Sequence, residues 1–155
     1  MAETSTGSVR RFSLRPATEA DFPAIRALIR QVRINPTKLD WRRFAVAVNG
    51  SGQMIGCAQL KPVPGELTEL ASLAVLPNYR HQGLARALIE HLLADAPRPV
   101  YLTCRSNLGV LYEKFGFRAL EADETPAYYR RLQRLAGLLM ELARRGETLL
   151  VMKLG

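Results

Sequence analysis

The stretch LAVLPNYRHQGLARALIEHLL (residues 73–93) decides the fold, because it joins an apolar strand to an amphipathic helix through a polar hinge. The apolar run ends at Leu76 and Pro77, and a pattern of helical period begins directly after RHQG (residues 80–83). A strand and a helix can be joined by a simple turn. The charged and polar residues of this hinge therefore need a further explanation.

The first turn of any helix offers unpaired backbone N–H groups and the positive end of the helix dipole, so it favours anions, above all phosphate. Gly83 and Ala85 are small enough to let an oxygen atom approach this backbone, and Arg80 adds a positive fork suited to phosphate. The alternative is an ordinary loop with a solvated arginine. Local physics alone leaves both interpretations open.

Composition indicates a globular chain. Its 155 residues are 48% hydrophobic and 23% charged, which predicts a real core, with a mobile tail at residues 1–11 and one domain at residues 12–155. No apolar run reaches the roughly 18 residues of a membrane span. The net charge of +8 permits a polyanionic partner without identifying it. Cys57 and Cys104 lie in apolar runs, which indicates buried thiols in a reducing, cytoplasmic compartment and no metal site.

Periodicity and turn residues predict a mixed α/β domain in the order β-α-β-β-β-α-β-α-β-α-β. Strands are predicted at residues 11–16, 39–48, 54–62, 66–76, 100–104, 117–120 and 148–154. Helices are predicted at residues 21–33, 84–95, 106–116 and 126–145. Ser106 is expected to cap the third helix. The last helix is expected to pack through an apolar stripe of Leu132, Leu135, Leu139 and Leu142.

The hinge RHQGLA (residues 80–85) has an Arg, a Gly three positions later and an Ala two positions after that. The strand before it ends LAVLP (residues 73–77), the segment LYEKFGF follows at residues 111–117, and the chain opens with RPATEADFPAI at residues 15–25. In these four segments the chain resembles the GNAT superfamily of N-acetyltransferases. The resemblance implies a central, mostly antiparallel sheet of about seven strands flanked by helices, with an extra helix before the last strand.

The resemblance also implies acetyl-coenzyme A (acetyl-CoA) as cosubstrate, no metal, and a primary amine of a small molecule or protein as acceptor. In the family the hinge wraps the pyrophosphate, and the pantetheine arm lies along the preceding strand. This carries over to Arg80, His81, Gln82, Gly83, Leu84 and Ala85 for the hinge and to Leu73, Ala74 and Val75 for the strand. In the family an asparagine often contacts the cofactor, and Arg105 occupies its position here. Asn107 stands two positions later and is the candidate for the same contact.

Acetyl transfer needs a neutral amine, a donor for the oxyanion and a proton for the leaving thiolate. Tyr112 occupies the family's general-acid position, and a backbone N–H near Val75 is the expected oxyanion donor. Glu69 matches the general base of the histone-acetyltransferase branch, and strand alternation places Glu69, Ala71, Leu73 and Val75 on one face. The alternatives are a packing tyrosine, a solvated carboxylate, and water molecules as the proton acceptor.

The helix at residues 126–145 departs from the common family pattern, which has a short loop there. It either shapes the acceptor pocket, forms a homodimer contact or only covers the sheet edge. A non-catalytic acetyl-CoA sensor or partner-binding module on the same fold is the rival to an enzyme. Binding of nucleic acid rests on charge alone and lacks an aromatic and basic platform, so neither nucleic acid nor a membrane is an expected partner.

Overall fold

The computed structural model describes residues 11–138 and 146–155, so residues 1–10 of the predicted tail lie outside the described residues. The predicted order of elements is confirmed. The elements are β1 (Phe12–Pro16), α1 (Phe22–Gln31), β2 (Phe44–Asn49), β3 (Met54–Val63), β4 (Leu67–Val75), α2 (Leu84–Ala94), β5 (Val100–Arg105), α3 (Gly109–Glu113), β6 (Arg118–Ala119), α4 (Ala127–Leu138) and β7 (Leu149–Leu154). No helix in the described ranges has the length and apolar character needed to cross a bilayer.

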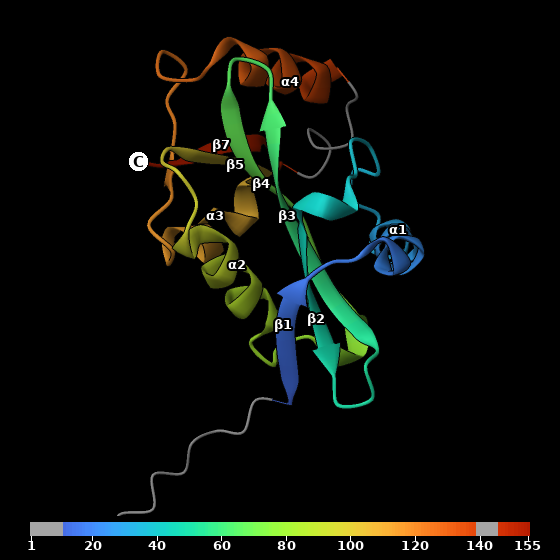
Figure 1. Cartoon of the computed structure of the whole chain (residues 1–155). Coiled ribbons are helices and arrows are strands. Elements are labelled where there is room, and N and C mark those ends of the chain that lie inside the picture. Colours follow the sequence, from blue (N-terminus) through green and yellow to red (C-terminus); the bar gives the residue numbers. More distant parts are fainter. Residues whose placement is uncertain (1–10, 139–145) are drawn as a thin grey trace, which may run out of the picture.

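The strands form one seven-stranded sheet in the order β1-β2-β3-β4-β5-β7-β6. Every neighbouring pair is antiparallel except β4 and β5, which run parallel. Helix α1 covers one face of the sheet, whereas α2 and α3 cover the other (Figure 1). The mixed α/β fold expected from the sequence is therefore confirmed, including its mostly antiparallel sheet.

The two parallel strands are joined over a short distance. Their register contains only the pairs Thr68 with Val100 and Glu69 with Tyr101. Beyond these pairs β4 and β5 diverge, and the sheet opens between them (Figure 1). The β4 edge from Leu70 to Val75 consequently has no ladder partner on the β5 side, so its backbone groups on that side are left for another partner.

A β-bulge interrupts β4 at Ser72. Opposite β3, Ala71 pairs with Gln59 and Ala74 pairs with Cys57, so β4 carries one extra residue at this point. Ser72 has a φ of 58°, and its hydroxyl lies 2.8 Å from the Nε2 of the buried Gln59, which donates to it. Such a φ in a residue other than glycine is uncommon and indicates a locally constrained backbone.

The bulge reverses the alternation of side chains along β4. Leu70 packs against α2 before the bulge, and after it Leu73 and Val75 pack against the α2 side. Glu69 instead points toward the opposite face, where it contacts α4. The prediction that Glu69, Leu73 and Val75 share one face is therefore wrong, because simple alternation takes no account of the extra residue.

Helix α4 lies across the end of the β3–β4 hairpin (Figure 1). The predicted leucine stripe is confirmed at Leu132, which is half-buried and packs against the core, and is wrong at Leu135, which is 56% exposed. The helix packs mainly through Tyr129, which is fully buried with Tyr101 beneath it. Leu139 and Leu142 lie outside the described residues.

The predicted cap at Ser106 is also wrong. Ser106 follows β5 and continues its pairing with β7: its backbone N–H donates to the Thr148 carbonyl at 2.8 Å, and its hydroxyl accepts the Thr148 N–H at 3.0 Å. The helical segment begins at this residue as a 3-10 turn, η4 (Ser106–Leu108), with Arg105 at the capping position. Continuation of the ladder thus decides the hydrogen bonding of Ser106.

Candidate active site

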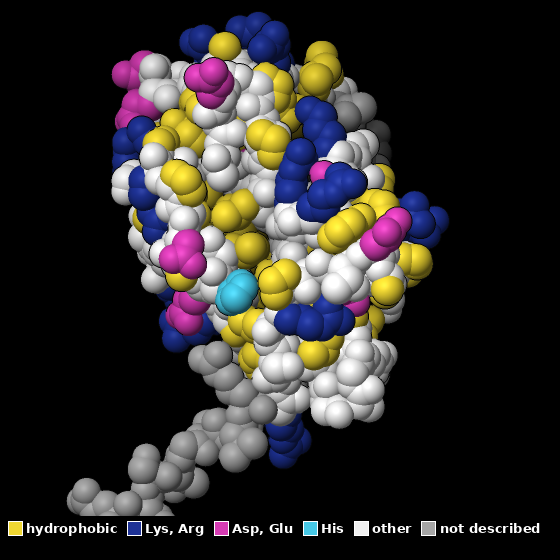
Figure 2. Space-filling model, in the orientation of Figure 1, with side chains coloured by type: hydrophobic (Ala, Val, Ile, Leu, Met, Phe, Trp, Pro, Cys, Tyr) yellow, Lys and Arg dark blue, Asp and Glu magenta, His cyan; other side chains and the backbone are white. Residues whose placement is uncertain are grey.

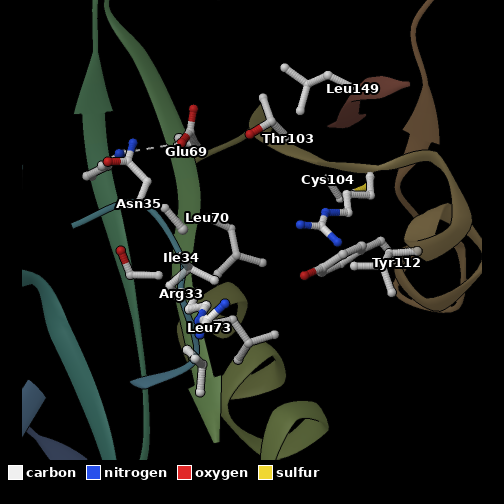
Figure 3. Close-up of a pocket in the computed structure, with 16 residues that line it drawn as sticks. Arg33, Ile34, Asn35, Glu69, Leu70, Leu73, Thr103, Cys104, Tyr112 and Leu149 are labelled. Atoms are coloured by element: carbon white, nitrogen blue, oxygen red, sulfur yellow. Dashed lines mark ion pairs between the residues drawn. The ribbon is translucent and has the colours of Figure 1, made fainter. Parts of the chain in front are cut away.

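A cavity of about 490 Å³ occupies the opening between β4 and β5. Its walls come from the end of α1 and the loop after it, from β3, β4 and β5, and from η4, α3 and the start of β7. Polar groups and apolar side chains line it together (Figure 3). The cavity thus brings residues far apart in the sequence around one space of small-molecule size.

Tyr112 reaches this cavity from α3. Its hydroxyl points into the space, and its ring packs edge-on against Phe117 with centroids 6.3 Å apart (Figure 3). Burial, together with the nearby Cys104, raises the pKa of Tyr112 to about 12, so the phenol keeps its proton at neutral pH. The residue combines a packed ring with a hydroxyl directed at open space, as a proton donor requires.

Glu69 lines the opposite side of the cavity and is 6% exposed, so the alternative of a solvated carboxylate is wrong. Its Oε2 accepts a 2.6 Å hydrogen bond from the Tyr129 hydroxyl of α4. Its Oε1 lies 3.7 Å from the Nζ of Lys61, which stands opposite on β3 (Figure 3). A buried carboxylate held by two partners can remain charged in a largely dry setting.

The polar hinge lies between η3 (Pro77–Tyr79) and α2. Gly83 caps α2 with a φ of 84°, and His81 also has a positive φ, of 62°. No atom lies within 4 Å of the position that a Cβ on Gly83 would occupy, so the backbone at the start of α2 is open to approach. Arg80, His81 and Gln82 are exposed around it. An anion could therefore approach the start of α2, where the first N–H groups of a helix have no partner within the helix.

Leu84 and Ala85 can contribute to this hinge only in part. Leu84 is 2% exposed and its side chain belongs to the core with Leu88, so only its backbone can face a ligand. Ala85 is half-buried. On β4, Leu73 lines the cavity directly, whereas the side chain of Ala74 is buried against α1, which leaves its backbone for contacts.

Asn107 lies apart from these residues. It is exposed in η4 and does not line the cavity, although Arg105 and Leu108 on either side of it do. The structure therefore does not bring Asn107 together with Tyr112 and Glu69, and its role toward the cofactor stays a prediction.

Several residues of the site were not foreseen. Lys61 could have been found from the hairpin, because a turn at residues 64–66 places Lys61 opposite Glu69. Arg33, which has a φ of 58°, and Asn35 enter from the loop after α1, and no sequence motif indicates them. Tyr129 reaches Glu69 across sixty positions of sequence, a distance that local patterns do not span.

The outer surface around the opening is mixed in character. Figure 2 shows hydrophobic side chains along the middle of this face, with Lys and Arg side chains on either side. Among residues 11–138 and 146–155, no three His, Cys, Asp or Glu side chains are grouped to hold a metal ion.

Comparison with known proteins agrees with this arrangement. Residues 40–119 match the acetyltransferase (GNAT) domain. An uncharacterized N-acetyltransferase of Chlorobaculum tepidum is 32% identical over 90 residues, which are 55% of this chain and 56% of the relative. The chain thus spans little more than half the length of that curated relative.

Two solved structures share the fold. N-acetylglutamate synthase from Neisseria gonorrhoeae, complexed with coenzyme A and N-acetyl-glutamate, superposes with a TM-score of 0.69 at 26% identity, over 93% of this chain and 35% of the synthase. A Mycobacterium tuberculosis protein in complex with CoA gives a TM-score of 0.65 at 21% identity, over 90% of this chain and 97% of its own. The second likeness concerns the fold alone.

Proposed function

Because the chain belongs to the GNAT acetyltransferase family, we propose that it transfers the acetyl group of acetyl-CoA directly to a primary amine. The observation that carries the proposal is the cavity between β4 and β5, with the Tyr112 hydroxyl on one side and Glu69 on the other. Acid and base groups on two walls of one space suit a reaction that removes a proton from one reactant and gives one to the other.

The donor is held by backbone groups and by the hinge. The unpaired edge of β4 offers N–H and C=O groups at Leu73, Ala74 and Val75, which suit the amide-containing arm of acetyl-CoA. The open backbone at Gly83 and the Arg80 guanidinium suit its pyrophosphate. His81, Gln82 and the N–H groups of Leu84 and Ala85 complete this cradle.

Acetyl-CoA supplies an activated thioester, and the chain supplies proton transfer and orientation. Glu69 accepts a proton from the acceptor ammonium across the cavity through water, which leaves a neutral amine. The amine nitrogen forms a bond to the thioester carbon, a backbone N–H near Val75 stabilises the oxyanion, and the carbon–sulfur bond then breaks. Tyr112 donates its proton to the departing thiolate and regains one from the amine, so one proton in total is released to solvent.

We further propose that the acceptor carries a carboxylate beside its amine, as an amino acid does. Arg33 and Arg105 both line the cavity, and an arginine fork matches a carboxylate. The likeness to an N-acetylglutamate synthase supports this class of acceptor. A protein N-terminus or a lysine side chain remains the alternative, and the cationic lining disfavours polyamines.

We also propose a cytoplasmic location, because the two buried free cysteines, Cys57 and Cys104, suit a reducing compartment. Burial raises the pKa of Cys57 to about 12 and that of Cys104 to about 11, so both thiols stay protonated and unreactive. A homodimer contact through α4 likewise stays a prediction.

An acceptor screen that follows thiol release from acetyl-CoA tests the proposal. Amino acids, amino acid amides, short peptides and polyamines should be compared at equal concentration. Turnover that needs the free carboxylate supports the finer proposal, and turnover with peptides alone overturns it. Binding of acetyl-CoA without turnover on any amine would instead support a sensing module.

A further inference from the structure

A buried polar network closes one end of the cavity. The β3–β4 hairpin sets Lys61 directly opposite Glu69, and their side chains are 7% and 8% exposed. Both residues line the cavity. The side chain that completes the network is Tyr129 of α4, whose residue is 0% exposed.

Tyr129 lies behind the carboxylate and does not itself line the cavity. Its hydroxyl lies 2.6 Å from Glu69 Oε2, within the range of a charge-assisted O–H···O⁻ bond. Tyr101 stacks on its ring at 5.6 Å with an interplanar angle of 29°, and Tyr128 meets it edge-on at 5.0 Å. Two aromatic neighbours thus fix the ring, and with it the direction of the hydroxyl.

The two oxygens of Glu69 consequently have different surroundings. Oε2 is occupied by a donor that belongs to the protein core. Oε1 faces Lys61 at 3.7 Å, which is longer than a hydrogen bond and leaves room for a further partner. Oε1, to which no side chain of the described residues donates a hydrogen bond, is therefore the oxygen better placed to receive a proton from the cavity side.

We infer that Tyr129 is a positioning residue, which holds Glu69 by Oε2 so that Oε1 accepts the proton of the acceptor amine. The inference rests on the base role proposed for Glu69. It gives α4 a part in the proton transfer, beyond covering the sheet edge. On this inference α4, which precedes β7, serves the acceptor side of the site. The donor side does not depend on it.

A hydrogen bond to the charged form of a carboxylate favours that form. Burial, and then the adjacent Glu69 carboxylate, raise the pKa of Tyr129 well above its ordinary value, so its hydroxyl stays a donor. Titratable side chains reach Glu69 from three neighbouring elements. These are Lys61 from β3, Tyr128 and Tyr129 from α4, and Tyr101, which pairs beside Glu69, from β5. Two further lysines lie one layer away: Lys153 of β7 lies over the Tyr101 ring, and Lys38 lies over the Tyr128 ring.

The test is Tyr129→Phe, which removes the hydroxyl and keeps the ring. The Glu69 carboxyl carbon should be followed by carbon-13 NMR at neutral pH, in the wild type and the variant. We expect its signal to shift in the variant, since the hydrogen bond from the Tyr129 hydroxyl to Oε2 is lost. Tyr101→Phe is the matched control, because it changes the same stack without removing a hydrogen bond to Glu69.

Turnover gives a second measurement. In Tyr129→Phe the acidic limb of the rate profile should move to higher pH and kcat should fall about 10-fold, with KM for acetyl-CoA unchanged. In a Glu69→Gln background the same change should cost no further turnover, because Tyr129 acts only through Glu69. If the Glu69→Gln background unfolds because Lys61 then lacks its counter-charge, a Glu69→Gln, Lys61→Met background removes both charges of the buried pair and keeps the test available.

An unchanged Glu69 carboxyl signal in Tyr129→Phe overturns the inference, as does an equal loss of turnover in the wild-type and Glu69→Gln backgrounds. The NMR measurement needs no acceptor. A shifted signal in a protein that acetylates no amine would therefore uphold the contact between Tyr129 and Glu69 and reject the proposed function alone.

Discussion

The two ends of β4 build their halves of the site in different ways. At the Leu73–Val75 end, the strand has no partner on the β5 side, and α2 begins just beyond it with an open backbone. At the Glu69 end, three side chains from β3, β4 and α4 meet in a buried network. The first end offers mainly main-chain groups and the second offers mainly side chains.

Under the proposed function, this difference would let one fold keep its donor and change its acceptor. Backbone groups are present whatever the side chains are, so a donor held by them tolerates sequence change elsewhere. A base that depends on Lys61 and Tyr129 is instead sensitive to single substitutions. The Ser72 bulge lies between the two ends and turns their side chains to opposite faces.

Tyr112→Phe should have the largest effect, because Tyr112 is the proposed proton donor to the departing thiolate. The ring and its packing on Phe117 remain, so the fold should persist. We expect kcat to fall by about 10²–10⁴-fold, the usual contribution of a positioned acid, with KM for acetyl-CoA nearly constant. Steady-state kinetics checks this. A variant that runs at the parent rate would remove Tyr112 from the chemistry.

Glu69→Gln should lower turnover by about 10²-fold at neutral pH, where the acceptor amine is protonated. The deficit should shrink as the pH rises above the pKa of the acceptor amine, because the amine is then neutral without a base. Glu66→Gln, at an exposed position outside the cavity, is the control. A deficit that does not change with pH would mean that Glu69 supports structure alone.

Sequence reasoning succeeded where the determining residues are close together. The hinge at Arg80–Gly83, the hairpin turns and the helix period are all local, and they predicted the order of every element. It failed at Ser72, because no glycine or proline marks that bulge. It also failed at Tyr129, whose contact to Glu69 depends on where α4 packs and not on its leucine period.

Arg80→Ala should affect the donor end alone. Loss of a charge-assisted bond to phosphate should weaken acetyl-CoA binding by about 1–3 kcal/mol, measured by calorimetry. Arg26→Ala is the control, because it removes one positive charge from an exposed position on α1. It therefore reproduces any effect of the lower overall positive charge on binding. Equal affinities in the two variants would show that the hinge does not hold the pyrophosphate. A changed acceptor preference in Arg80→Ala would break the separation between the two ends.

Asp21→Asn should have the smallest effect on turnover, because Asp21 lies at neither end of β4. Its carboxylate binds the Arg15 guanidinium at 2.7 Å and the Thr18 N–H at 2.7 Å, at the start of the first helical segment. The hydrogen bond from Arg15 contributes most, and together these contacts lower the pKa of Asp21 from 3.8 to about 2. A depressed folded-state pKa contributes stability that is fully present above the unfolded value and is lost as the pH falls toward the folded one. Urea unfolding should therefore show the wild type more stable than Asp21→Asn at pH 7, with the gap narrowing from pH 4 toward pH 2. At neutral pH and assay temperature kcat should equal that of the wild type, and a large loss of kcat in a folded variant would mean that the α1 region takes part in acceptor handling.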